Sequence, residues 1–292
     1  MASRRETVNR LKLILAVVVL YKVRAEQSQS FSSLQRLLAE DPEAARTIDL
    51  MVCDNTPYEQ PQPAGFPGLY VSDTTNPGLA KCYNLALRVA QERGATWLLL
   101  LDQDTTLTAE YLREIVAQTR EQAADTGIVA LVPKLIQDGV VQSPHTRPTY
   151  RHAKFDRSVA GRYQGWLYAF NSASILRVAA LEAIDGFPEQ FWLDFLDHAT
   201  FHRLQQAGGR LLVLDACLEH ELSTNDIGKK DAASRKRYQN VLDAEHSFYR
   251  QYGSVADRIF HRIRLLRGFL GLLLKRRRPG EALVLLKAAA RT

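Results

Sequence analysis

The chain has 292 residues, of which 46% are hydrophobic and 24% are charged, and its formal net charge is +6. This composition is typical of an ordinary globular protein and excludes global disorder. The length allows one large domain with a tail, or two small domains.

The three cysteines are Cys53, Cys82 and Cys217, an odd number at wide spacings and without a C-x-x-C pair. This pattern argues against a disulfide framework and against a zinc knuckle. It predicts reduced thiols in a cytosolic protein.

The first apolar run, Leu13–Leu20, follows the basic residues Arg4 and Arg5. It is too short to span a bilayer. Glu6 interrupts the positive region and no small-residue cleavage site follows, so we do not interpret it as a signal peptide. Its Val, Ile and Leu content predicts the first strand of a parallel sheet, buried on both faces.

Apolar runs then alternate with amphipathic stretches along the chain. Strands are predicted at Leu13–Leu20, Ile48–Cys53, Leu69–Ser72, Trp97–Leu101, Ile128–Pro133, Ala169–Arg177 and Arg210–Leu214, and helices at Ser30–Glu40, Leu79–Arg93, Thr108–Ala123, Asp197–Ala207 and from Lys230 onward. Gln137–Tyr163 is expected to be a long functional loop. The alternation predicts an α/β fold with an open, mostly parallel sheet flanked by helices.

Polar residues follow several of these strands. Ligands of open α/β sheets bind beyond the carboxyl ends of the strands, where Asp54, Asn76 and Asp102 fall. Asp102 and Asp104 follow a fully apolar strand with one residue between them, and two such carboxylates repel unless a cation lies between them. The pair is a candidate Mg²⁺ or Mn²⁺ site for a diphosphate. The alternative is that the two acids cap the next helix.

Further motifs occur in order along residues 13–250, namely Val17–Tyr21, Val52–Asn55, Asn76–Asn84, Leu100–Asp104, Gly186–Asp197, Arg203–Gly208 and His220, followed by Arg237–Asn240 and Phe248–Arg250. In this order they resemble the family-two glycosyltransferases, especially the bacterial rhamnosyltransferase-like branch. The resemblance implies a GT-A fold. It also implies a metal-dependent, inverting transfer of a sugar to a hydroxyl of a saccharide or lipid-linked acceptor, in bacterial surface polysaccharide synthesis. The branch implies dTDP-rhamnose as the donor, with galactofuranose or glucose donors as alternatives.

The resemblance also implies roles for individual residues. The donor nucleotide sugar would contact Tyr21, Asp54, Asn55, Asn76, Gly78, Asn84, Asp102 and Gln103, and Mn²⁺ or Mg²⁺ would be held by Asp102, Asp104 and His220. Asp197 would be the general base. The acceptor would contact Asp194, Trp192, His198 and Ser172. The alternatives are an ordinary Asx turn at Asp54–Asn55 and helix capping by the two later acids.

Two departures from the family pattern keep other functions open. Ala199 stands where the family often has a second acid, and Phe170–Ala173 replaces its usual Ser-Gly. A non-catalytic subunit that binds sugar nucleotides is therefore an alternative. A nucleotidyltransferase is a second one, although Tyr21–Arg24 lacks the glycines of a phosphate loop.

The chain is expected to divide into a catalytic domain at residues 1–228 and a helical extension at 229–292. In the extension, arginines alternate with apolar residues from Ile259 to Leu274, and the basic run Lys275–Arg278 follows. This pattern is typical of an amphipathic helix at a membrane surface, or of one packed against the domain or a second subunit. We expect a cytoplasmic protein, peripheral to the inner membrane face in the first case. No motif that reads nucleic acid is present.

Overall fold

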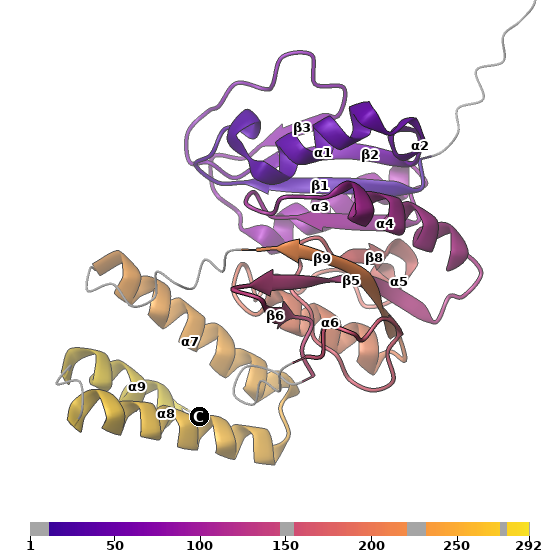
Figure 1. The fold of residues 1–292 in the computed structure, drawn as a ribbon. Coiled ribbons are helices and arrows are strands. Elements are labelled where there is room, and N and C mark those ends of the chain that lie inside the picture. Colours follow the sequence, from indigo (N-terminus) through magenta and orange to yellow (C-terminus); the bar gives the residue numbers. More distant parts are fainter. Residues whose placement is uncertain (1–11, 147–154, 221–231, 275–278, 292) are drawn as a thin grey trace, which may run out of the picture.

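One mixed sheet organises the main domain. The computed structural model describes residues 12–146, 155–220, 232–274 and 279–291. Within these residues nine strands form a sheet in the order β3-β2-β1-β4-β8-β5-β9-β7, with β6 paired to β5 (Figure 1). The strands are β1 Ile14–Leu20, β2 Ile48–Asp54, β3 Leu69–Ser72, β4 Trp97–Leu101, β5 Ile128–Gln137, β6 Val140–Ser143, β7 Gly161–Arg162, β8 Ile175–Arg177 and β9 Arg210–Glu219.

Most strands of the sheet run in one direction. β1 pairs in parallel with β2 and β4, β2 with β3, and β5 with β9. β8 lies between β4 and β5 and is antiparallel to both, and β6 and β7 are also antiparallel to their partners. The predicted open, mostly parallel sheet is therefore confirmed. All seven residues of β1 are buried, because helices cover both faces of the sheet.

Two helical layers bury the two faces. One face carries α1 Gln29–Glu40, α2 Pro42–Thr47 and α4 Ala109–Glu121, and the other carries α3 Leu79–Glu92, α5 Val178–Glu182 and α6 Leu196–Gln206. Side chains of β1 alternate between the layers, with Val17 facing α3 and Val18 facing α1 and α4. A short 3-10 helix, Ala25–Gln27, connects β1 to α1.

Three helices, α7 Ala232–Tyr252, α8 Val255–Leu274 and α9 Pro279–Arg291, follow the sheet (Figure 1). Phe248 and Tyr249 of α7 join the core of the main domain. The tail has a second, smaller core of Leu242, Leu265, Leu285 and Ala289. The predicted domain boundary at residue 228 lies outside the described residues and stays a prediction. No helix in the described part of the chain is both long and apolar enough to cross a membrane.

Several predicted elements differ from the structure. The strand predicted at Ala169–Arg177 is reduced to β8, because Ala173 has a left-handed φ of 57° that an extended strand does not tolerate. The loop predicted at Gln137–Tyr163 contains β6 and β7, and its residues 147–154 lie outside the described residues. The short helix α2 was not predicted. Asp41 caps it and Pro42 begins it, and proline at the first helical position is a known signal for the start of a helix.

Candidate active site

The turn after β4 carries the D-x-D pair, and the start of α1 holds it in place. The Ser30 Oγ accepts from the Thr105 backbone N–H at 3.1 Å and donates to the carbonyls of Asp102 and Thr105. The Gln103 carbonyl accepts from the Gln29 N–H at 3.0 Å. These bonds fix the backbone from which both carboxylates project. Asp102 is half-buried and Asp104 is exposed.

Two hydroxyls converge on the Asp102 carboxylate. The Tyr83 hydroxyl is 3.3 Å from Oδ1, and the Ser172 hydroxyl donates to Oδ2. Ser172 is 2% exposed and its hydroxyl bonds to Asp102, so its predicted acceptor contact stays a prediction without a supporting contact. Tyr83 is fully buried, and burial together with the Asp102 charge raises the pKa of its hydroxyl well above the ordinary value.

His220 lies beside the same turn. Its Nδ1 is 3.3 Å from the Thr105 Oγ1, and its backbone N–H donates to the Ile136 carbonyl at 3.0 Å. The end of β9 thus brings the imidazole next to the residue that follows Asp104. The structure therefore brings the three predicted metal ligands to one edge of the sheet.

The ligands themselves do not complete a metal site. Among the described residues, no three His, Cys, Asp or Glu side chains are arranged to hold a metal ion. Two carboxylates and an imidazole nevertheless fit Mn²⁺ or Mg²⁺ when phosphate oxygens of a substrate supply the remaining ligands. Metal binding by Asp102, Asp104 and His220 stays a prediction.

Asp54 and Asn55, at the end of β2, are both buried. The Asp54 Oδ1 accepts from the Thr56 N–H at 2.9 Å, which is the Asx turn of the alternative interpretation. Its Oδ2 accepts from the Tyr70 hydroxyl at 2.7 Å and from Gln60 at 3.1 Å, and burial, reinforced by this bond, raises the pKa of Tyr70. The Asn55 Oδ1 accepts from the Cys82 thiol at 2.9 Å. The bonds found are structural, and a nucleotide contact of either side chain stays a prediction.

Tyr21 and Gln103 connect the end of β1 to the D-x-D turn. The Tyr21 N–H donates to the Gln103 Oε1 at 2.8 Å. The Tyr21 side chain is 41% exposed, and the Lys22 ammonium lies 5.0 Å from its ring centroid. An exposed ring at this edge is available to stack on a base, as predicted for Tyr21.

The start of α3 packs directly on Trp192. The Trp192 carbonyl accepts from the Leu79 N–H at 2.7 Å, in place of a side-chain cap. Gly78 precedes it with a φ of 90°, and a Cβ there would lie 2.6 Å from the Trp192 ring. Glycine is therefore required by this contact, whereas the sequence suggested an approach of the backbone to the donor. Asn76 also has a positive φ, 52°, in the turn before it.

Asn84 has a structural partner for each of its polar atoms. Its Oδ1 accepts from the Phe187 N–H at 2.8 Å, and its Nδ2 donates to the Phe187 carbonyl at 2.9 Å and to Glu189 at 3.3 Å. The side chain thus joins α3 to the turn before the acidic segment. Its predicted donor contact stays a prediction without a supporting contact.

Asp197 lies in the first turn of α6. The backbone N–H and the Nδ1 of His198 both reach its Oδ1, at 2.7 and 2.8 Å. The side chain is 20% exposed, and among the described residues no hydrogen-bond donor is found at Oδ2. Burial acts to raise the pKa of Asp197, but His198 and His145 outweigh it and leave the pKa below its ordinary value.

The predicted acceptor contacts near Asp197 divide into two groups. Trp192 is 44% exposed, as a sugar-stacking residue would be. Asp194 instead pairs with Arg237 of α7, and burial, partly offset by that arginine, raises the pKa of Asp194. His198 is 6% exposed and packs among Tyr168, Phe195 and Phe248, so its predicted acceptor contact stays a prediction without a supporting contact.

Tyr83 connects the two halves of the site. Its hydroxyl contacts Asp102, and the nearby charge of Asp197 also raises its pKa. Asp197 therefore lies within electrostatic reach of the Tyr83 hydroxyl that contacts Asp102. Sequence reasoning missed Tyr83, His145 and Thr105, because their roles arise from contacts across the fold and carry no motif of their own.

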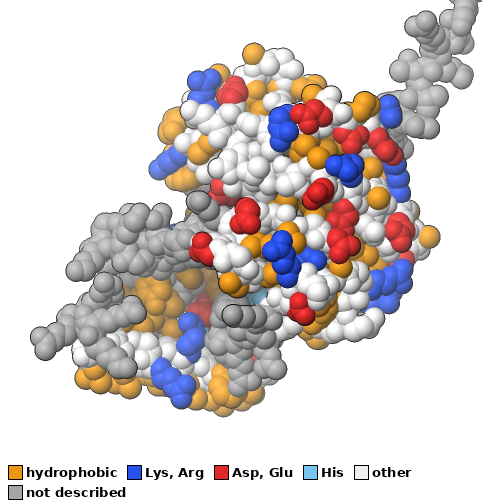
Figure 2. All heavy atoms as spheres, in the orientation of Figure 1, with side chains coloured by type: hydrophobic (Ala, Val, Ile, Leu, Met, Phe, Trp, Pro, Cys, Tyr) orange, Lys and Arg blue, Asp and Glu red, His pale blue; other side chains and the backbone are white. Residues whose placement is uncertain are grey.

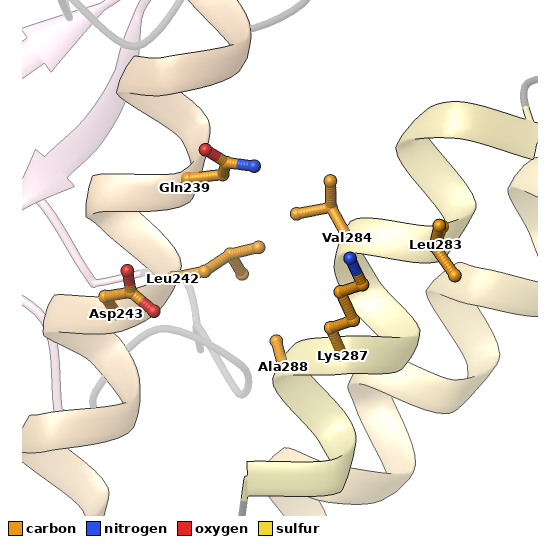
Figure 3. Close-up of a pocket in the computed structure, with 7 residues that line it drawn as sticks. All are labelled: Gln239, Leu242, Asp243, Leu283, Val284, Lys287 and Ala288. Atoms are coloured by element: carbon orange, nitrogen blue, oxygen red, sulfur yellow. The ribbon is translucent and has the colours of Figure 1, made fainter.

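A separate cavity of about 430 Å³ lies between α7 and α9. Figure 3 shows Lys287 reaching into the gap from α9, opposite Gln239 and Leu242 of α7. Its lining includes none of the predicted site residues. We therefore assign the chemistry to the sheet edge and not to this cavity.

Comparison with known proteins gives structural matches only. No family model matches this sequence, and no curated protein sequence matches it either. The crystal structure of S. aureus TarS 1–349 matches 95% of this chain and 87% of its own length, with a TM-score of 0.52 and 16% identity. The structure of that fragment in complex with UDP-GlcNAc matches 95% of this chain and 91% of its own length, with a TM-score of 0.52 and 14% identity.

The chain has the GT-A fold. A longer TarS structure matches 95% of this chain but only 53% of its own length, so the chain spans about half of it. At such identities the likeness establishes the fold alone. The rhamnosyltransferase-like branch stays a prediction.

Proposed function

We propose that the chain is an inverting glycosyltransferase that moves a sugar from a nucleotide diphosphate donor to a hydroxyl. The observation that carries the proposal is the partly exposed Asp197 carboxylate, with Oδ1 held by His198, within electrostatic reach of the Tyr83 hydroxyl that contacts Asp102. The complex of TarS with UDP-GlcNAc supports a sugar nucleotide as the donor, because that protein shares the fold. Carboxylate and imidazole ligands at the D-x-D turn would suit a divalent cation, which would in turn bind the donor's diphosphate.

The chemistry follows from this geometry. The acceptor hydroxyl gives its proton to the Asp197 Oδ2 as its oxygen bonds to the anomeric carbon. The bond from that carbon to the diphosphate oxygen breaks, and the configuration at the carbon inverts. A divalent cation at Asp102, Asp104 and His220 would stabilise negative charge on the leaving diphosphate. We propose that the exposed Trp192 stacks on the acceptor sugar.

The donor and acceptor are proposed from the resemblance. We propose dTDP-rhamnose as the donor and a saccharide or lipid-linked acceptor of bacterial surface polysaccharide synthesis. UDP-GlcNAc becomes an equal candidate because of the TarS complex. Pocket shape discriminates between such donors, so a panel that also contains glucose and galactofuranose nucleotides is required.

The test measures release of the nucleoside diphosphate with each donor, in Mn²⁺, in Mg²⁺ and with a chelator. Asp197→Asn should reduce kcat by about 10²- to 10⁴-fold, the usual contribution of a general base. It should still bind the donor, measured as a donor-dependent rise of the melting temperature. Asp138→Asn, at an exposed acid in the β5–β6 turn, is the matched control.

Four results would overturn parts of the proposal. Full activity of Asp197→Asn removes the assigned base. Release of pyrophosphate would identify a nucleotidyltransferase. Donor binding without transfer to any acceptor would favour a non-catalytic partner subunit, the alternative raised by Ala199. Activity in the chelator would remove the metal.

We also propose that α8 attaches the protein to an anionic membrane surface. One face of α8 is apolar and exposed, with Ile259 at 53% and Leu270 at 49% exposed, while His261 and Leu265 on the other face are buried. Exposed arginines flank the apolar face at positions 258, 262 and 267. Figure 2 shows hydrophobic and basic side chains along the outer edge of the α8–α9 hairpin. Lys275–Arg278 lies outside the described residues.

Vesicle sedimentation tests this attachment. The protein should sediment with vesicles that contain anionic lipid and not with neutral ones. Leu270→Glu should abolish sedimentation, whereas Tyr58→Glu, at an exposed aromatic of the main domain, should not. If Leu270→Glu instead splits a dimer measured by light scattering, the face binds a second copy of the chain.

A further inference from the structure

Behind the proposed base lies a buried pair of histidines. The His198 Nε2 is 3.2 Å from the His145 Nε2, and the His198 Nδ1 is 2.8 Å from the Asp197 Oδ1. His145 is 2% exposed and His198 is 6% exposed. The three side chains therefore form a chain of hydrogen bonds that runs from the base into the core.

The partners determine the tautomer of each ring. A carboxylate only accepts, so the Nδ1 of His198 carries a proton. In neutral His198 the Nε2 is then an acceptor, and the facing Nε2 of His145 must be the donor. Two protons in this short contact would repel, as would two lone pairs. With both rings neutral, the arrangement thus requires opposite tautomers in the two histidines.

Aromatic packing holds both rings in place. Tyr168 stacks on His145 at 6.0 Å and on His198 at 5.6 Å between centroids. The His145 and Tyr168 backbones also pair through two N–H···O bonds of 2.8 Å. Phe195, which precedes α6, and Phe248 of α7 both contact His198. These apolar contacts exclude water, so no solvent donor replaces a lost ring contact.

We propose that His198 and His145 are positioning residues that hold Asp197 with its Oδ1 occupied and its Oδ2 turned to the acceptor. The inference rests on the proposed function, because it assigns this role toward Asp197 as the base. A base oriented by a further group is a recurring arrangement in enzymes. In this protein the oriented group is the Asp197 carboxylate. Ala199, next to the orienting His198, replaces the second acid of the family pattern.

Several charged groups face Asp197 in addition to the histidines. Asp194, from the preceding turn, and the Tyr83 hydroxyl, from α3, both interact electrostatically with it. Arg237 of α7 pairs with Asp194. Loss of the His198 side-chain bond would leave only the backbone N–H of residue 198 and His145 to lower the pKa of Asp197, against burial and the Asp194 charge. Both act to raise its pKa, so the base would lose its ionised form at a higher pH.

A measurement without substrate tests the hydrogen-bond chain. Nitrogen NMR of ¹⁵N-histidine-labelled protein reports the protonated nitrogen of each ring, and single His→Phe variants assign the signals. We expect protonated Nδ1 in His198 and protonated Nε2 in His145. The reverse tautomers in either ring would overturn the proposal, whatever the protein catalyses.

Kinetics test the positioning role. His198→Phe and His145→Phe should reduce kcat on the order of 10- to 100-fold, as losses of orienting partners do. The acid limb of the pH profile should move to higher pH, and the donor KM should stay unchanged. His145→Gln, which restores a donor near Nε2, should recover much of the rate. Circular dichroism monitors the fold of each variant.

His202→Phe is the matched control. His202 lies in the same aromatic cluster, with its Nδ1 3.3 Å from the Tyr168 hydroxyl and its ring 6.0 Å from Phe248. The His202→Phe variant should leave the acid limb of the pH profile unchanged. Suppose that the wild type transfers sugar and Asp197→Asn does not. If folded His145→Phe then retains the wild-type rate and the wild-type acid limb, the positioning role is wrong and the proposed function stands. If the wild type transfers no sugar, the proposed function fails.

Discussion

The Asn84→Ala variant tests whether Asn84 has a structural role or binds the donor, because the two roles predict different consequences of this substitution. The substitution removes both bonds to the Phe187 backbone, of 2.8 and 2.9 Å. Phe187 is 1% exposed, so its N–H and carbonyl lose their partners in a buried position. An unpaired buried polar group costs about 1–3 kcal/mol.

The sum for two groups is roughly 2–6 kcal/mol. Alanine returns about 0.5 kcal/mol of helix propensity in α3. Asn84 itself is half-buried, so water can reach the turn after a small movement. We therefore expect a loss of about 2–3 kcal/mol in the free energy of unfolding, toward the lower end of the sum.

Urea unfolding measures this loss, followed by circular dichroism and tryptophan fluorescence. The midpoint should fall while the slope stays unchanged, as expected when only stability changes. Arg88→Ala, at an exposed position one turn further along α3, should stay within about 0.5 kcal/mol of the wild type. A stable Asn84→Ala protein whose melting temperature no longer responds to any sugar nucleotide would refute the structural reasoning. It would support the donor contact expected from the sequence.

Three further changes test other parts of the fold. Gly78→Ala should cost about 2–4 kcal/mol in thermal unfolding, since φ is 90° and the new Cβ would meet Trp192. Arg237→Ala should cost about 1 kcal/mol at pH 7 and less at pH 4, where Asp194, whose pKa burial raises, is increasingly protonated. Burial, reinforced by neighbouring cations, lowers the pKa of His261 from 6.5 to about 4. As the pH falls, His261 of the unfolded chain therefore binds its proton at a higher pH than His261 of the folded chain. The free energy of unfolding should fall by up to about 3 kcal/mol between pH 6.5 and 4. The His261→Phe variant should lack this loss.

The sequence determined the elements that depend on local patterns. The apolar runs of β1 and β4 predict strands buried on both faces, and the acids after β4 predict polar chemistry at the strand ends. The amphipathic pattern of α1 and α3 likewise locates these helices to within one or two residues. These features follow from hydrophobic periodicity and chain direction, which a single sequence contains.

Tertiary structure alone decided the partners of the polar atoms. Ser172, predicted to contact an acceptor, donates to Asp102 because the turn around Ala173 brings β8 beside β4. His198 turns inward because His145, 53 positions earlier, approaches it from the end of the β5–β6 hairpin. Such contacts join distant segments through the sheet order. No local pattern encodes that order, so the sequence could name candidate residues for a site but not the atoms that they face.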